Sequence, residues 1–141
     1  MTDEDSVNDD VTPTLVDPET DAVGIRAARA ADDKGGTDTV VLRVGDVLGI
    51  PELFVLTGAS NPRLVKAVVE EIEAQFAFDG GPRPLRVEGF EDSRWVLMDY
   101  GDWVAHVFLE EARAFYDLER LWADVPRLDW SPDVAPSAAE G

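Results

Sequence analysis

Cysteine is absent from this sequence, and histidine occurs once, as His106. Without cysteine the chain has no disulfide framework and no thiol nucleophile, and a structural zinc site loses its usual sulfur ligands. These absences exclude thiol catalysis and disfavour a structural zinc site.

Long apolar runs are also missing. No uninterrupted apolar segment reaches the roughly 20 residues that a membrane-spanning helix needs. The first ten residues, MTDEDSVNDD, are acidic and polar, the reverse of a secretory or transit peptide. We therefore expect a cytoplasmic location and no membrane partner.

Basic residues are scarce, with 12 Lys and Arg against 30 Asp and Glu. Residues 1–21 hold eight of the acids and residues 128–141 hold three, and neither segment contains Lys or Arg. The remaining residues, 22–127, therefore have 19 acids and 12 bases, a net charge of about −7. Nucleic-acid affinity comes from Lys and Arg displacing counterions, so we expect little direct nucleic-acid binding. A basic protein surface is the natural partner, although in the tails the acidity can equally serve solubility alone.

The 141 residues suit one domain with two tails. Residues 1–17 lack periodicity and predict a disordered acidic N-terminal extension. Residues 18–125 form the predicted domain, and residues 126–141 a flexible Pro-rich tail in which Trp130 is a candidate anchor.

The pattern of elements predicts an α/β fold, a five-stranded mixed β-sheet flanked by helices. Helices are expected from about residue 18 to 34, with a small-residue face for close packing, and from 61 to 78, with Ser60 as N-cap. Strands are expected at 37–44, 53–58 and 84–90, and the continuous apolar character of 53–58 indicates a central strand.

Residues 94–122 are the densest aromatic region. Alternation around Gly101-Asp102 predicts a hairpin with a two-residue loop, in which Tyr100 faces Trp103 and Leu97 faces His106. Neither face of this hairpin is polar, so each must be covered by helices or by a partner. Helical spacing resumes near Glu110, and the expected buried positions of that last helix are Ala112, Phe115, Leu118 and Trp122.

Three local patterns have possible chemistry. Gly58-Ala59-Ser60 can be a small anion-binding turn, or a tight turn with a helix cap. Asp99 and Asp102 can hold a divalent cation, or serve as turn formers. Asp99 also lies diagonal to His106, where a hydrogen bond or simple packing is expected. Together they define an alternative function, a nucleotidyltransferase-like phosphate- or nucleotide-binding enzyme using Gly58, Ser60, Asp99 and Asp102.

A group of aromatic and arginine side chains is the stronger signal. Trp, Tyr and Arg dominate the energetics of protein interfaces. This group exceeds what so small a core needs, and we expect about half of it to be exposed: Trp95, Tyr100, Trp103, Arg113 and Tyr116.

Three segments together resemble the ribosomal silencing factor family, RsfS, also called Iojap: TGASNPRLVKAV, then EGF and RWVLMDYGDWVAHVF, then RAFYDLERLW. The resemblance runs from about Asp21 to Trp122 and is most specific in its last third. Trp103 stands where the family usually has an aliphatic residue.

The resemblance implies a translational repressor and no enzyme, with a nucleotidyltransferase-like fold, no catalytic residues, no metal and no cofactor. Family members bind the large ribosomal subunit through ribosomal protein L-fourteen and sterically block the small subunit, in stationary phase or nutrient limitation. Free members can form a homodimer. The residues we expect to bind the partner are Trp95, Met98, Asp99, Tyr100, Asp102, His106, Arg113 and Tyr116.

Overall fold

A computed structural model describes residues 18–131, so the expectations for residues 1–17 and 132–141 lie outside its described range. The elements are α1 (Pro18–Asp33), β1 (Thr37–Arg43), α2 (Gly45–Leu48), β2 (Leu53–Ala59), α3 (Pro62–Phe78), β3 (Arg86–Glu88), β4 (Trp95–Asp99), β5 (Trp103–Leu109), α4 (Glu110–Tyr116), α5 (Leu118–Leu121) and β6 (Arg127–Leu128). The α/β class and the flanking helices agree with the sequence prediction.

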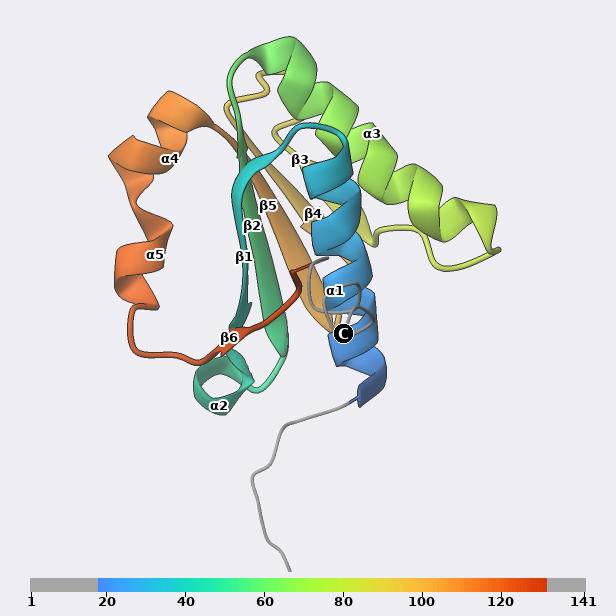
Figure 1. Cartoon of the computed structure of the whole chain (residues 1–141), viewed down its shortest axis with the longest axis vertical. Helices are drawn as coiled ribbons and strands as arrows, with labels where there is room; N and C mark the ends of the chain where they lie inside the picture. The colour runs from blue at the N-terminus through green and yellow to red at the C-terminus, as the bar shows by residue number, and fades with distance from the viewer. Residues whose placement is uncertain (1–17, 132–141) are drawn as a thin grey trace, which may run out of the picture.

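One mixed sheet organises these elements, in the order β3-β4-β5-β2-β1-β6 (Figure 1). Only β2 and β5 are parallel, and the other pairs are antiparallel. The predicted count of five strands is wrong, because Arg127 and Leu128 pair with β1. Two residues are too short to produce a strand pattern in a sequence. This segment lies in the predicted tail, where Trp130 also donates a hydrogen bond from Nε1 to the carbonyl oxygen of Thr39 at 2.8 Å.

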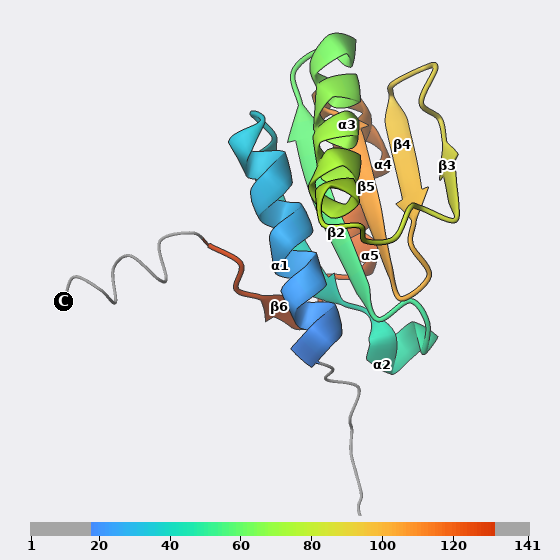
Figure 2. The ribbon, with the colours of Figure 1, turned by 90° about the vertical axis from the view of Figure 1, so that its right-hand side faces the viewer.

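Helices α1 and α3 lie side by side over one face of the sheet (Figure 2). The small residues of α1 permit a close approach: a Cβ atom on Gly24 would lie 2.6 Å from Cδ1 of Leu53. The prediction of a closely packed small face is therefore confirmed. Helix α3 begins one residue later than predicted, since Oδ1 of Asn61, not Ser60, accepts the N–H of Leu64 at 2.9 Å.

The two parallel strands form the centre of the core. Every residue of β2 and of β5 is buried, which confirms the prediction of a central strand at residues 53–58. Burial on both sides also explains why neither strand alternates polar and apolar side chains.

The hairpin of β4 and β5 has the predicted register, with Leu97 opposite His106 and Asp99 opposite Val104. Gly101 adopts a φ of 92°, which a two-residue hairpin turn with glycine first requires. Side chains alternate between two faces. We call the face under α1 and α3 the helix face. The other is the open face, defined by Phe54, Trp95, Leu97, Asp99, Val104, His106 and Phe108.

The helical segment after β5 is broken where one helix was predicted. Asp117 takes a left-handed conformation with φ 50°, and its N–H bonds to the carbonyl oxygen of Arg113, so α4 ends at Tyr116 and α5 follows. Asp is among the residues that tolerate this conformation. Phe115 lies on α4, before this break, and is 76% exposed. The prediction that Phe115 is buried is wrong.

Candidate protein-docking face

The open face is only partly covered. In Figure 1, α4 and α5 lie on the opposite side of the sheet from α1 and α3. The ring of Trp122 packs edge-on against Phe54 with centroids 5.5 Å apart, and Tyr116 packs on Trp95 at 4.9 Å. Toward β3 and β4, Leu97 and Asp99 remain half-buried. An incompletely covered apolar sheet face is a feature of interaction surfaces.

His106 lies within this face rather than on its surface. Nδ1 accepts a hydrogen bond from Nε1 of Trp95 at 3.0 Å, so the neutral ring carries its proton on Nε2. Nε2 is buried, without a partner among residues 18–131. Burial lowers the pKa of His106 to about 4, so the ring is neutral at physiological pH. His106 therefore orients Trp95, as a supporting group.

The diagonal pair expected between Asp99 and His106 does not form a hydrogen bond. Oδ1 of Asp99 instead accepts the N–H of Gly101 at 2.9 Å, which stabilises the hairpin turn. Oδ2 of Asp99 faces Nε of Arg86 at 3.4 Å. Both side chains lie on the open face, as predicted, but each has another partner.

Aromatic rings form a continuous group at the α4 end of the open face. Tyr116 is 47% exposed and contacts both Trp95 and Phe115, whose ring lies 5.0 Å away and nearly perpendicular. Trp95 is half-buried beneath them. Exposed aromatic side chains over a half-buried aromatic base resemble the anchor groups of protein interfaces.

A depression of about 430 Å³ lies at the other end of the open face. Its apolar floor contains Phe54, Leu97 and Val104, and its rim contains the exposed side chains of Ile50 and Leu85. The complete lining is Ile50, Pro51, Phe54, Leu85, Arg86, Leu97, Asp99, Gly101, Val104 and His106. The sequence did not mark Ile50, Leu85 or Arg86 as site residues. Ile50 lies in a connection, and the predicted strand that contains Leu85 and Arg86 gave no sign that it pairs beside Asp99.

Two of the predicted partner-binding residues belong to the other side of the sheet. Met98 is fully buried on the helix face, so in this structure it presents no surface to a partner, contrary to what a contact residue requires. Tyr100 stacks on Trp103 with ring centroids 4.2 Å apart, and Trp103 is buried. The Tyr100 hydroxyl is buried, and burial together with the Glu73 charge raises its pKa to about 12. Alternation along β4 separates both side chains from Trp95 and Asp99.

Arg113 and Asp102 complete the predicted set. The Arg113 side chain is only 12% exposed, since it donates to the carbonyl oxygens of Thr37 and Asp38 and pairs with Glu119 at 3.1 Å. It joins α4 to the start of β1 and to α5. Asp102 is exposed at the hairpin turn. About half of the group Trp95, Tyr100, Trp103, Arg113 and Tyr116 was expected to be exposed. Only Tyr116 of these five is exposed.

The residues of the enzyme alternative are not brought together. Gly58 pairs with Phe108 near one end of β5, whereas Asp99 pairs with Val104 near the other end, so roughly 13 Å of strand separates them. Within residues 18–131 no group of three or more His, Asp or Glu residues is placed to hold a metal ion. In that same range no helix is long and apolar enough to cross a membrane.

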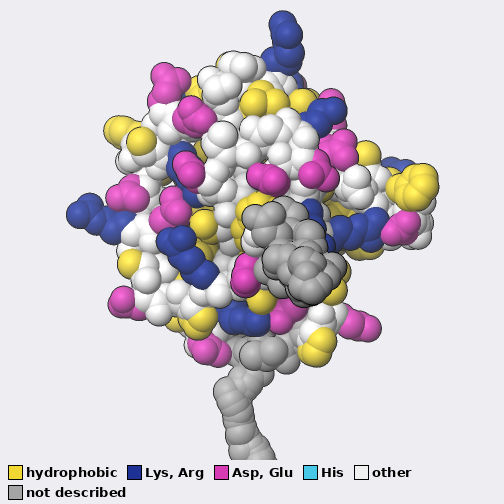
Figure 3. All heavy atoms as spheres, in the orientation of Figure 1, with side chains coloured by type: hydrophobic (Ala, Val, Ile, Leu, Met, Phe, Trp, Pro, Cys, Tyr) yellow, Lys and Arg dark blue, Asp and Glu magenta, His cyan; other side chains and the backbone are white. Residues whose placement is uncertain are grey.

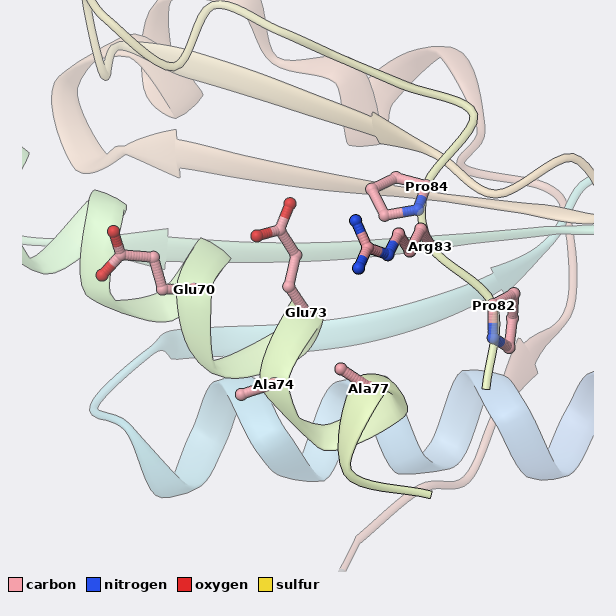
Figure 4. Close-up of a pocket in the computed structure, with 7 residues that line it drawn as sticks. All are labelled: Glu70, Glu73, Ala74, Ala77, Pro82, Arg83 and Pro84. Atoms are coloured by element: carbon pink, nitrogen blue, oxygen red, sulfur yellow. The ribbon is translucent and has the colours of Figure 1, made fainter. Parts of the chain in front are cut away.

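A second depression, of about 480 Å³, lies on the α3 side of the molecule (Figure 4). Glu70 and Glu73 project from α3, and the side chain of Arg83 turns back toward the helix beside them. It is separate from the open face and contains no member of the predicted site.

Charge does not by itself mark one surface. Figure 3 shows acidic, basic and hydrophobic side chains intermixed over the side of the molecule seen in Figure 1. What distinguishes the open face is its incompletely covered apolar surface, with Asp99 and Asp102 at the hairpin end.

The fold is that of a small α/β protein with a single mixed sheet, one face of which is incompletely covered. The family described as ribosomal silencing factor during starvation, RsfS, matches residues 17–140. The chain therefore belongs to the ribosomal silencing factor family, whose members are regulatory proteins that associate with the ribosome.

Individual relatives agree with this assignment. The chain is 38% identical over 103 residues to the ribosomal silencing factor RsfS of Bacillus subtilis, covering 73% of this chain and 86% of that one. A crystal structure from Chromobacterium violaceum is similar with a TM-score of 0.69 and 29% identity, covering 72% of this chain and 84% of that chain. A mouse protein named mitochondrial assembly of ribosomal large subunit protein 1 is 27% identical over 88 residues, 60% of this chain and 38% of that protein.

Proposed function

We propose that this chain binds the large ribosomal subunit through ribosomal protein L-fourteen, blocks joining of the small subunit and so silences translation in stationary phase or nutrient limitation. Family membership over residues 17–140 carries the proposal. The resemblance supplies the specific partner, and the name of the mouse relative also connects this fold with the large subunit.

The open face supports a protein partner over RNA. Its apolar and aromatic character suits the buried centre of a protein interface, and residues 22–127 are acidic with a charge of about −7. An acidic surface repels phosphates and attracts a basic protein, so association should be faster at low salt. An interface of about 800 Å² on each partner is enough for a stable complex.

Within this face we propose Trp95, Asp99, Asp102 and Tyr116 as contacts. His106 and Arg113 act from beneath, by orienting Trp95 and by fixing α4. Blocking requires no catalysis, because a bound protein that overlaps the subunit interface excludes the small subunit by occupancy alone. A cytoplasmic location and a homodimer of the free protein remain part of the proposal.

Sedimentation in sucrose gradients tests the binding step. The purified protein, mixed with separated subunits, should sediment with the large subunit and be absent from the fractions that contain the small subunit. Cross-linking should then recover ribosomal protein L-fourteen as the attached neighbour. Sedimentation with the small subunit alone would rule the proposal out.

A further inference from the structure

We infer that the depression on the open face receives an arginine or lysine side chain of the basic partner, whose cationic head binds Asp99. Arg86 competes for the same carboxylate in the free protein. The inference rests on the proposed function for the nature of the partner, and it adds a defined subsite and an internal competitor.

The pair between Arg86 and Asp99 is weak in this structure. The two residues are direct partners on β3 and β4, so their side chains share the open face. Nε of Arg86 lies 3.4 Å from Oδ2 of Asp99, whereas a charge-assisted hydrogen bond is about 2.8 Å long. Nη1 of Arg86 is closer to Glu88, at 2.8 Å, and the Arg86 side chain is 59% exposed. Exposed pairs of this kind contribute little.

Asp99 has capacity for another cation. Its side chain is 25% exposed and lines the depression. Oδ1 accepts the N–H of Gly101, and Oδ2 has the 3.4 Å contact with Nε of Arg86. Two carboxylate oxygens offer about four acceptor positions, so a guanidinium or ammonium group has free lone pairs to bind.

The apolar walls fit the stem of such a side chain. Leu97 and Val104 lie beside Asp99 in the depression, and Leu85 and Ile50 stand at its rim with 73% and 71% exposure. Arginine and lysine bury their methylene stems against apolar surface and keep the charged head at a polar edge. His106, at the inner end, is neutral and adds no repulsion. A basic partner is the occupant that the acidic chain attracts.

The test uses the full chain and N-acetyl-arginine amide, followed by changes in backbone amide chemical shifts. The wild type should show saturating shifts at residues 97–104. Arg86→Gln removes the competitor and should tighten binding about two- to fivefold, the range that one exposed ion pair provides. Asp99→Asn keeps the acceptor for Gly101, so the fold is retained and the shifts should be lost.

Two controls isolate the mechanism. Arg83→Gln makes the same change of charge on the α3 side and should leave the affinity as in the wild type. N-acetyl-norleucine amide has an apolar stem without the charge and should give no Asp99-dependent shifts. If Arg86→Gln weakens binding or leaves it unchanged, the competition is refuted.

The same variants should be measured with purified large subunits, where Arg86→Gln should bind more tightly and Asp99→Asn more weakly. A wild type that binds the amide as described but not the large subunit would refute the proposed function and leave the subsite standing. A wild type that binds the large subunit, but shows no Asp99-dependent shifts with the amide, would refute the subsite and leave the function standing.

Discussion

The buried neutral state of His106 predicts how stability should depend on pH. Burial lowers the pKa of His106 in the folded protein to about 4, against about 6.5 in the unfolded chain. As pH falls below 6.5 the unfolded chain takes up a proton and the folded protein does not, so the unfolded state is favoured. The stability present above pH 6.5 is lost progressively as the pH falls toward 4.

Linkage gives the magnitude. The fall of the His106 pKa from about 6.5 to about 4 on folding corresponds to about 3 kcal/mol in total, of which about 2 kcal/mol should be lost between pH 7 and pH 5. The chain has 30 acidic groups, and their titration is superimposed on this effect. The reference is therefore His106→Asn, which keeps an acceptor near Nδ1 for Trp95 and shares every other titrating group.

Urea unfolding followed by tryptophan fluorescence, at pH 7, 6 and 5, measures the free energy of unfolding of both proteins. Between pH 7 and pH 5 the free energy of unfolding of the wild type should fall by about 2 kcal/mol more than that of His106→Asn. Because His106 is the only histidine, its ring resonances can be followed directly in the same range. A difference that stays constant from pH 7 to 5, with a ring that titrates near 6.5, would refute the buried neutral state.

Three other substitutions separate surface from core. Tyr116→Ala should lose only about 1 kcal/mol of stability in urea unfolding, because the side chain is half exposed. In filtration binding the same variant should bind the large subunit at least about tenfold more weakly. Unfolding of this variant would mean that Tyr116 is a core residue. Met98→Ala should cost about 3 kcal/mol in urea unfolding and leave the affinity of the folded protein unaltered, whereas an affinity loss in the folded variant would place Met98 at the interface. Arg113→Gln should cost about 1–2 kcal/mol and increase hydrogen exchange in α4, since it removes the bonds to Thr37 and Asp38; unchanged exchange would contradict its role in fixing α4.

Where the sequence predicted structure well, a strong local pattern was present. The apolar run of β2, the small residues of α1 and the alternation around Gly101 each reflect one physical requirement, respectively burial on two faces, close approach and a tight turn. The same alternation correctly divided Trp95 and Asp99 from Met98 and Tyr100. The predicted contacts lie on both sides of that division, so one flat partner surface cannot reach them all.

The remaining features depend on contacts between distant segments. Strand β6 exists because Arg127 and Leu128 meet β1, and a two-residue pairing leaves no periodic signal. The left-handed Asp117 interrupts a segment whose helical spacing continues through it. The depression beside Asp99 is assembled from three separate stretches of the chain, 50–54, 85–86 and 97–106, so it could be found only from the structure.

In the proposed function, a protein bound to the large subunit excludes the small subunit. Light scattering of purified large and small subunits, mixed at a magnesium concentration that permits joining, measures this directly. Pre-incubation of the large subunit with the protein should reduce the amplitude of joining in proportion to occupancy, and Tyr116→Ala should require a correspondingly higher concentration. Full joining with the large subunit saturated by bound protein would show that the bound protein does not exclude the small subunit.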